Sequence, residues 1–279
     1  MFKIVRKKQL NEQVVLLEIQ APFIAAKAQA GQFIIFRLNE QGERVPLTIA
    51  DHNSEKGTIT IIFQTVGEST MALGKLNEGD NINDVAGPLG VATKYEENIR
   101  KVAVIGGGVG CAIAYPQAKK LFGMGVEVDL ITGFRNKDIV ILEDEMKAVS
   151  TNLYICTDDG SYGTKGFVTD KLKELIEAGN KYDEVIAIGP VVMMKFVSKL
   201  TEQYGIKTLV SLNPIMIDGT GMCGGCRVTV DGKIKYACVD GPDFDGHKVD
   251  FDELIKRNSA YSKQENEHIC RLTGGKRNG

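Results

Sequence analysis

The chain has 279 residues, of which 43% are hydrophobic and 25% are charged. This length predicts two or three domains, and the composition is that of an ordinary globular protein. The net charge of −2 argues against a broad nucleic-acid or anionic-membrane surface, so we expect neither partner. The N-terminus lacks the apolar stretch of a signal peptide, and the longest apolar run, residues 102–115, contains four glycines. We therefore expect a cytoplasmic protein without a membrane span.

Residues 1–97 are expected to form a first, β-rich domain. In residues 12–20, Val15, Leu17 and Ile19 recur on one face of an extended chain. Further β-branched and aromatic runs cover residues 33–38, 45–51 and 57–66. Several short strands separated by turn residues predict an antiparallel barrel, and a short helix is expected after Gly67.

Residues 98–205 are expected to form a second domain in which strands and helices alternate. The strand patterns cover residues 101–107, 126–134, 152–159 and 184–190. The helical patterns cover residues 109–122, 139–149, 169–178 and 191–204. This alternation predicts βαβ units and therefore a parallel sheet.

Glycine-bearing loops follow several of these strands. The run Gly106-Gly107-Gly108-Val109-Gly110 lies between a strand and a helix, where a backbone can approach a pyrophosphate. Cys111 stands where the fingerprint G-x-G-x-x-G needs glycine or alanine, so a tight turn without a ligand is the alternative. The loop at 157–163 and the segment 189–193 follow other strands, and ligands bind at such strand ends. We expect one shared crevice, although the acids at 158 and 159 could equally cap the next segment.

A cysteine-rich loop opens the third expected domain, residues 206–279. Asp218, Cys223, Cys226 and Cys238 have the spacing D-x4-C-x2-C-x11-C. The plant-type 2Fe–2S pattern is C-x4-C-x2-C with a later fourth cysteine, so an aspartate replaces the first cysteine here. Because a carboxylate keeps the charge of the thiolate that it replaces, these four side chains are candidate ligands of a 2Fe–2S cluster. A hairpin is expected around residues 231–232, and the tail beyond 255 is charged.

A zinc site and disulfide bonds are the two alternatives to an iron–sulfur cluster. A structural zinc site usually brings two C-x2-C pairs or added histidines, and none of the three histidines has a zinc-ligand spacing from the single pair. Disulfides are disfavoured because the chain has six cysteines in 279 residues and no secretory signal. Cys111, Cys156 and Cys270 are expected to be ordinary thiols.

Two segments of the first domain carry donors for phosphate groups. Arg44, in the run Arg44-Val45-Pro46-Leu47-Thr48, is either a solvated charge or a phosphate ligand. The segment Gly67-Glu68-Ser69-Thr70 lies at a loop-to-helix junction and offers N–H and hydroxyl donors. Alone, each segment is also an ordinary turn or cap.

Together these motifs resemble those of the ferredoxin–NADP reductase superfamily, in which a flavin-binding barrel precedes a pyridine-nucleotide domain. The matching segments are residues 44–48 for the flavin motif R-x-Y/F-S/T, 67–70, 106–110, and 189–190 for the terminal C/G-P motif. Leu47 departs from the motif, which has an aromatic residue at that position. A further departure is Ala187-Ile188 before Gly189, where many relatives have a cysteine.

The cysteine loop is similar to that of two branches of this superfamily. One is the electron-transfer subunit of type B dihydroorotate dehydrogenase, which typically has four cysteines. The other is the small subunit of NADH-dependent ferredoxin:NADP+ oxidoreductase. Asp218 and the length of the tail after Cys238 favour the second branch.

The resemblance implies a set of binding residues. FAD would contact Arg44, Pro46, Leu47, Thr48, Gly67, Ser69 and Thr70. NAD(H) would contact Gly106, Gly107, Gly108, Val109 and Gly110 through its pyrophosphate, with Asp158, Asp159, Gly160, Gly189, Pro190 and Met193 on the nicotinamide side. The 2Fe–2S cluster would be held by Asp218, Cys223, Cys226 and Cys238.

The resemblance also implies an oxidoreductase that acts on NAD(P)H. Hydride would pass between NAD(H) and FAD, and single electrons would pass through the cluster to a larger subunit. In the resembled enzyme that partner carries another FAD and 4Fe–4S clusters, handles NADP(H) and ferredoxin, and takes part in electron bifurcation. No catalytic side chain is expected, because the cofactors carry the chemistry. The alternatives are a dihydroorotate dehydrogenase subunit and a non-redox module that binds nucleotide and zinc.

Overall fold

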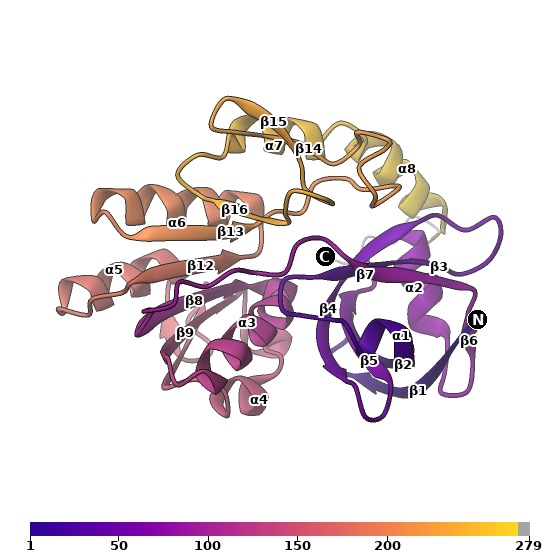
Figure 1. Cartoon of the computed structure of the whole chain (residues 1–279), viewed down its shortest axis with the longest axis horizontal. Helices are drawn as coiled ribbons and strands as arrows, with labels where there is room; N and C mark the ends of the chain where they lie inside the picture. Colours follow the sequence, from indigo (N-terminus) through magenta and orange to yellow (C-terminus); the bar gives the residue numbers. More distant parts are fainter. Residues whose placement is uncertain (273–279) are drawn as a thin grey trace.

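A computed structural model describes residues 1–272 and shows a β-barrel, an α/β unit and a smaller third unit that spans both (Figure 1). Residues 273–279 of the third expected domain lie outside the described residues. The architecture agrees with the fold class expected from the sequence.

The barrel is a seven-stranded antiparallel sheet in the order β6-β1-β2-β5-β4-β3-β7. Its strands are β1 (Phe2–Gln9), β2 (Val14–Gln20), β3 (Phe33–Arg37), β4 (Val45–Asn53), β5 (Thr58–Gln64), β6 (Asn81–Ile82) and β7 (Asp84–Leu89). Two short helices accompany them, α1 (Pro22–Ala25) and α2 (Glu68–Lys75). The side chains of Val15, Leu17 and Ile19 are buried inside the barrel, so the inward face expected for residues 12–20 is confirmed.

The α/β unit contains a second seven-stranded sheet in the order β11-β10-β9-β8-β12-β13-β16. Its strands are β8 (Lys101–Gly107), β9 (Glu127–Phe134), β10 (Asn152–Thr157), β11 (Thr164–Lys165), β12 (Glu184–Ile188), β13 (Lys207–Ser211) and β16 (Asp243–Asp245). All neighbouring pairs are parallel except β13 with β16. The predicted parallel sheet is therefore confirmed.

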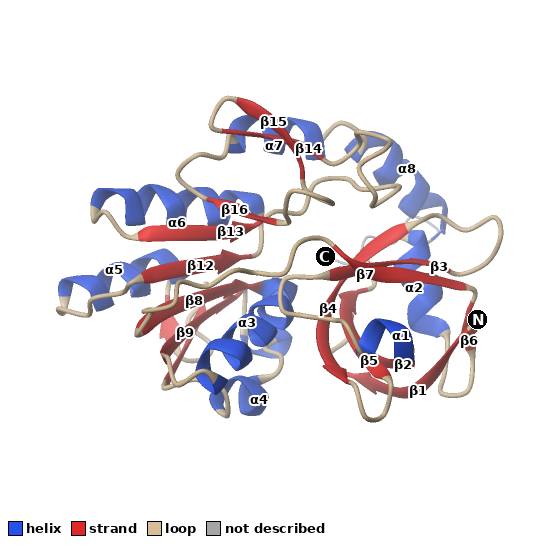
Figure 2. Ribbon diagram, in the orientation of Figure 1, coloured by secondary structure: helices blue, strands red, loops and turns tan. Residues whose placement is uncertain are grey.

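Helices cover both faces of this sheet (Figure 2). One face packs against α3 (Cys111–Gly123) and α4 (Glu143–Lys147), and the other packs against α5 (Val168–Glu177) and α6 (Val191–Gln203). Single 3-10 turns, η1 (Gly108–Gly110) and η2 (Lys137–Ile139), lead toward α3 and α4. Because both faces are covered, β12 is buried at every residue, and its sequence is apolar after Glu184.

The expected boundary at residue 205 falls too early for the sheet. β13 (207–211) pairs in parallel with β12, and β16 then pairs with β13. The reason is that residues 207–211 form a further strand of this sheet, although the alternation of strand and helix patterns ends near residue 205. Two segments that lie within the third expected domain, residues 207–211 and 243–245, thus belong to the second sheet.

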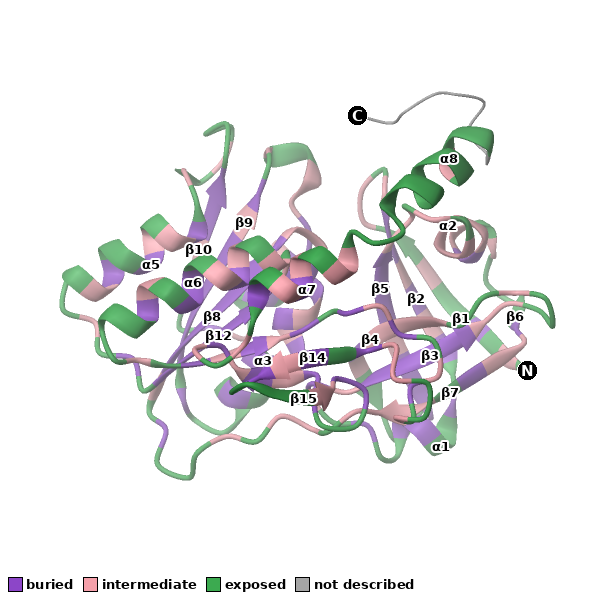
Figure 3. Cartoon of the chain, turned by 90° about the horizontal axis from the view of Figure 1, so that it is seen from above, coloured by how far each residue is buried: buried purple, intermediate pink, exposed green. Residues whose placement is uncertain are grey.

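The third unit contains a hairpin of β14 (Arg227–Val230) and β15 (Lys233–Tyr236), followed by α7 (Phe251–Asn258) and α8 (Ser262–Leu272). The expected turn is present, and both of its central residues have positive φ, +53° and +68°. The largely exposed helix α8 returns toward the barrel (Figure 3), where His268 Nε2 lies 3.1 Å from Glu68 Oε2. Over residues 1–272, no helix is both long and apolar enough to cross a membrane.

A buried carboxylate ties strands of the α/β sheet to the segment before β12. Asp129 on β9 is 1% exposed and accepts hydrogen bonds from Tyr182 Oη at 2.7 Å and Asn152 Nδ2 at 2.8 Å. Lys101 Nζ lies 3.3 Å from the same carboxylate. Burial, together with the bond to Asp129, raises the pKa of Tyr182 above its ordinary range. Both oxygens of the buried Asp129 carboxylate thus accept a hydrogen bond.

We expect Asp129→Ala to lower the free energy of unfolding of the α/β unit by roughly 3 kcal/mol, because the tyrosine, the amide and the lysine lose their shared acceptor. The matched control is Glu174→Ala, which removes an exposed acid paired with Lys171 and is expected to change stability by less than about 0.5 kcal/mol. Chemical denaturation measures both. Equal losses in the two variants would contradict a structural role for the buried acid.

Candidate functional site

The two segments expected to bind FAD lie side by side on the barrel. Arg44 lies in the loop before β4, and Pro46, Leu47 and Thr48 are half-buried within that strand. The second segment begins at Gly67, the N-cap of α2. Ser69 Oγ donates a 2.7 Å hydrogen bond to Glu43 Oε2, which joins the two segments.

The start of α2 offers backbone donors. Thr70 Oγ1 accepts a hydrogen bond from the Gly67 N–H at 3.1 Å and donates one to the Gly67 carbonyl at 3.0 Å. The hydroxyls of Ser69 and Thr70 are therefore engaged within the protein. Because the first N–H groups of a helix have no acceptor inside it, they are the donors that this turn presents to a phosphate.

The guanidinium of Arg44 reaches the cysteine loop. Its Nε donates to the Ile217 carbonyl at 2.9 Å, and its Nη2 donates to the Asp218 carbonyl at 3.1 Å. The residue expected to hold a flavin phosphate is thus bonded to the backbone of the segment expected to hold the cluster. Nothing in the local sequence around Arg44 signals this contact.

The glycine turn after β8 packs directly on the segment after β12. A side-chain Cβ on Gly110 would lie 2.6 Å from the Ile188 carbonyl oxygen, and one on Gly107 would lie 2.6 Å from the Met193 sulfur and 3.0 Å from Pro190. The backbones can approach this closely only because these glycines lack a Cβ. The turn thus brings together much of the expected NAD(H) set, Gly106, Gly107, Gly108, Val109, Gly110, Gly189, Pro190 and Met193.

The acidic residues expected near the nicotinamide lie elsewhere on the same edge. Asp158, Asp159 and Gly160 follow β10, which β9 and β8 separate from β12. Asp159 Oδ1 accepts a hydrogen bond from the Ser161 N–H at 2.9 Å, and the bonds from Ser161 lower the pKa of Asp159. Asp159 therefore shapes its own turn. The strand order divides the expected nicotinamide set into two groups.

Two of the candidate cluster ligands form a buried sulfur pair. Cys226 and Cys238 are each 2% exposed, and their Sγ atoms lie 3.1 Å apart. Burial and the neighbouring thiol raise the pKa of Cys238 to about 12. Cys223 is exposed, and its Sγ accepts a hydrogen bond from the Gly225 N–H at 3.4 Å, which lowers the pKa of this thiol.

The carboxylate of Asp218 shapes the loop from within. Its Oδ2 accepts hydrogen bonds from the Thr220 N–H at 2.9 Å, the Met222 N–H at 3.3 Å and the Thr220 hydroxyl. The hydrogen bonds from Thr220 lower the pKa of Asp218 below its ordinary value. The sequence Asp-Gly-Thr is typical of such an Asx turn, although we did not predict one. A metal-ligand role for this residue would use Oδ1 or a rotated side chain.

The donor set fits iron with sulfur ligands, although the four side chains form no closed cage. Within residues 1–272, no three His, Cys, Asp or Glu side chains are gathered tightly enough to hold a metal ion. Three thiols, two of them in contact, still supply the soft ligands that iron–sulfur centres use, and an N–H group points at the Cys223 sulfur. Cys111 and Cys156 are buried free thiols in the α/β unit, as expected.

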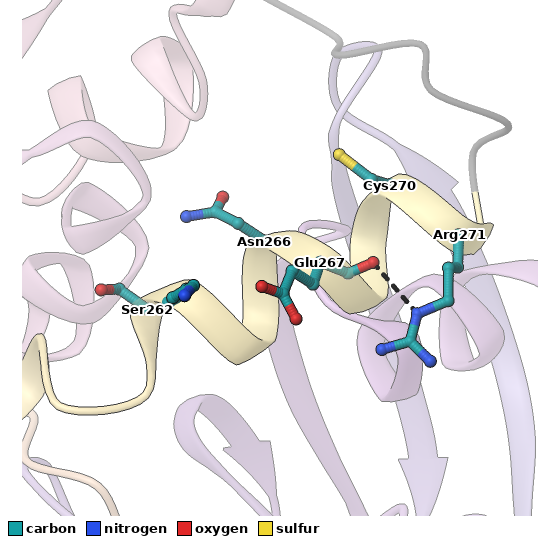
Figure 4. A pocket seen from close by; sticks show the side chains of 6 residues that line it. Ser262, Asn266, Glu267, Cys270 and Arg271 are labelled. Atoms are coloured by element: carbon teal, nitrogen blue, oxygen red, sulfur yellow. Dashed lines mark hydrogen bonds between the residues drawn. The ribbon is translucent and has the colours of Figure 1, made fainter.

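A separate surface hollow runs along α8 (Figure 4). It is lined by Ser262, Lys263, Asn266, Glu267, Cys270 and Arg271. The Arg271 Nε donates to the Glu267 carbonyl at 3.4 Å within the same helix. The hollow includes none of the residues expected to bind a cofactor.

A family model matches residues 213–250, the stretch that contains the four candidate ligands. It describes the iron–sulfur cluster binding domain of dihydroorotate dehydrogenase B. The match supports an iron–sulfur assignment for the cysteine loop over a zinc assignment.

Whole-length relatives were also found. The chain is 48% identical to a dihydroorotate dehydrogenase B (NAD+) electron transfer subunit homolog of Thermotoga maritima, over 94% of this chain and 92% of the relative. It is 34% identical to the corresponding subunit of Fusobacterium nucleatum subsp. nucleatum, over 84% and 92%.

Among solved structures, a chain from a study of flavin-based electron bifurcation by the NADH-dependent reduced ferredoxin-NADP oxidoreductase aligns with a TM-score of 0.92 at 45% identity. The alignment covers 98% of each chain. The chain therefore belongs to the family of dihydroorotate dehydrogenase B electron-transfer subunits and their homologues, which have a ferredoxin reductase-like fold.

Proposed function

We propose that this chain is the electron-transfer flavoprotein subunit of a heteromeric oxidoreductase that catalyses electron bifurcation between NADH, NADPH and ferredoxin. It would exchange hydride with NAD(H) at FAD and pass single electrons through a 2Fe–2S cluster to a partner subunit. The near-complete alignment with the bifurcating oxidoreductase structure supports this proposal over its alternatives. The observation that carries it is the cysteine loop held against the barrel by Arg44.

Each unit would have its own task. The barrel would hold FAD between β4 and the start of α2, and the turn at 106–110 would receive the NAD(H) pyrophosphate at the beginning of α3. The packing of this turn on Pro190 and Met193 would form the floor of the proposed nucleotide site. Bound flavin would supply the exchange between two-electron and one-electron chemistry, and the protein would supply position and electrostatics.

The partner would dock near the cysteine loop. Met222 is 86% exposed, and Ile217 and Val239 on the same unit are also exposed. Apolar side chains displayed around the exposed Cys223 are typical of an interaction surface. We propose that the partner is a larger subunit with another FAD and 4Fe–4S clusters, which binds NADP(H) and ferredoxin.

The same chemistry fits a second role, because several relatives are named as electron-transfer subunits of dihydroorotate dehydrogenase B. The two roles differ in the partner. An α/β-barrel partner with FMN would favour dihydroorotate oxidation, whereas a larger partner with FAD and 4Fe–4S clusters favours bifurcation.

The direct test is anaerobic purification with the native partner, followed by an absorption spectrum and by iron, sulfide and flavin analysis. Beyond the cofactors of the partner, we expect one FAD, two iron atoms and two acid-labile sulfide atoms for each copy of this chain. A 2Fe–2S centre contains two iron and two sulfide atoms. Zinc without acid-labile sulfide would support a non-redox module and contradict the proposal.

Two substitutions separate iron ligation by Asp218 from its role in the loop. Asp218→Asn keeps an oxygen that can accept the Thr220 and Met222 hydrogen bonds, but an amide lacks the charge of an iron ligand. We therefore expect Asp218→Asn to lose cluster, and Asp218→Cys to retain a 2Fe–2S centre with a changed potential. Iron content and EPR spectra measure both. A wild-type iron content and spectrum in Asp218→Asn would show that this residue serves the loop alone.

Gly110→Ala tests the nucleotide crevice. The added Cβ would meet the Ile188 carbonyl, so the turn must move, and we expect NADH binding to weaken about tenfold or more. The control is Gly123→Ala at the other end of α3, where a Cβ meets nothing within 4 Å and the backbone is not left-handed. Titration with NADH under anaerobic conditions gives both affinities. Equal affinities in the two variants would count against this turn as the pyrophosphate site.

A further inference from the structure

Arg44 makes two bonds to a segment more than 170 residues away in sequence. The acceptors are consecutive carbonyls, those of Ile217 and Asp218, at 2.9 and 3.1 Å. A guanidinium presents its N–H groups in a rigid planar fork, so two bonds to adjacent acceptors fix direction as well as distance. The side chain therefore orients the backbone that leads into the cysteine loop.

A second contact presses the same segment onto the barrel. Gly219 has φ of +83°, and a Cβ there would lie 2.5 Å from Ile35 Cδ1 and 3.0 Å from Leu89 Cδ1. Ile35 on β3 pairs in register with Pro46 on β4, two residues beyond Arg44. The hydrogen bonds from Arg44, which precedes β4, and the contact of Gly219 with Ile35 on β3 therefore lie beside neighbouring strands.

The cysteine loop also shares a hydrophobic core with the barrel. The buried side chains of Cys226 and Cys238 share one continuous core with Phe33 and Ile35 of β3 and with the α5–α6 face of the α/β sheet. The part of the loop from Ile217 to Cys223 contributes no residue to this core and depends on other contacts for its position. Arg44 and Gly219 supply it at the end that carries the expected oxygen ligand.

We propose that Arg44 is a positioning residue for electron transfer, which holds the cluster-binding loop against the flavin barrel and contributes positive charge beside the cluster. This inference rests on the proposed function. It assigns to Arg44 a role at the cluster in addition to, or in place of, the flavin-phosphate role expected from the motif. The segment Ile217–Gly219 is the part of the chain on which it acts.

The charge has a predictable consequence. A reduced cluster carries one more negative charge than an oxidised one, so a nearby guanidinium stabilises the reduced form and raises the midpoint potential. Removing the charge should therefore make the potential more negative. Removing the fork while keeping a charge should loosen the loop and leave the potential close to its original value.

The test uses the full chain with its partner, prepared anaerobically as wild type, Arg44→Gln, Arg44→Lys and Arg37→Gln. Arg37 is a matched control because it is a barrel arginine paired with Asp84. We expect Arg44→Gln to show a more negative cluster potential by EPR titration and about tenfold faster amide exchange over residues 217–222. Arg44→Lys should restore the potential but not the slow exchange, and Arg37→Gln should match wild type in both.

A parallel pair of variants keeps the test decisive if Arg44→Gln fails to retain iron. Gly219→Ala should speed exchange over residues 217–222 with unchanged FAD content, whereas Gly232→Ala, which adds a Cβ at positive φ with nothing within 4 Å, should not. Loss of FAD in Arg44→Gln with unchanged potential and exchange would overturn the inference and leave the motif's flavin role. Absence of a cluster from the wild-type protein would instead refute the proposed function. Amide exchange over residues 217–222 would then be the test of whether Arg44 holds the loop.

Discussion

The close approach of the Ile217–Gly219 backbone to the flavin barrel is the contact on which the arrangement of the sites depends. A glycine without a Cβ lets the chain lie against Ile35 and Leu89, and Arg44 bonds the carbonyls next to it. Without this contact the third unit would still be joined to the first by the shared core, by α8 and by the hydrogen bond from the Val91 N–H to the Gly241 carbonyl. A loop that binds a redox centre must lie close to its flavin, and here the barrel itself holds the loop.

A glycine also allows a close contact at the proposed nucleotide site. Gly110 lies against the Ile188 carbonyl, so the turn after β8 and the segment after β12 meet without intervening side chains. Adjacent parallel strands make this possible, because their carboxyl ends emerge side by side. Glycine thus brings two backbone segments together at the turn after β8, and it brings the cysteine loop against side chains of the barrel.

The sequence predicted the barrel, the parallel sheet and the hairpin well because each depends on local periodicity or turn chemistry. The strand patterns of residues 12–20 and 184–190 are short-range features, and so is the positive-φ turn at Asp231-Gly232. Long-range features escaped prediction. The boundary at 205 was wrong for the sheet because β13 continues it past the change in composition.

The candidate sites show the same division between local and long-range information. Spacing alone identified the cysteine loop and the glycine turn, and the structure places Gly107 beside Pro190 and Met193. The spacing of residues in the sequence could not reveal that Arg44 contacts Asp218, because no local pattern encodes a contact across 174 residues. Strand order likewise decides that Asp158 lies apart from the Gly189 segment, and strand order is a property of the whole sheet.

The most direct measurement is anomalous X-ray diffraction at the iron edge from crystals of the anaerobically prepared complex. Our account predicts two iron peaks among Asp218, Cys223, Cys226 and Cys238, beside the barrel strand that begins after Arg44, with flavin density on the same barrel. An iron-free loop in such crystals, or a single zinc peak in it, would contradict the account.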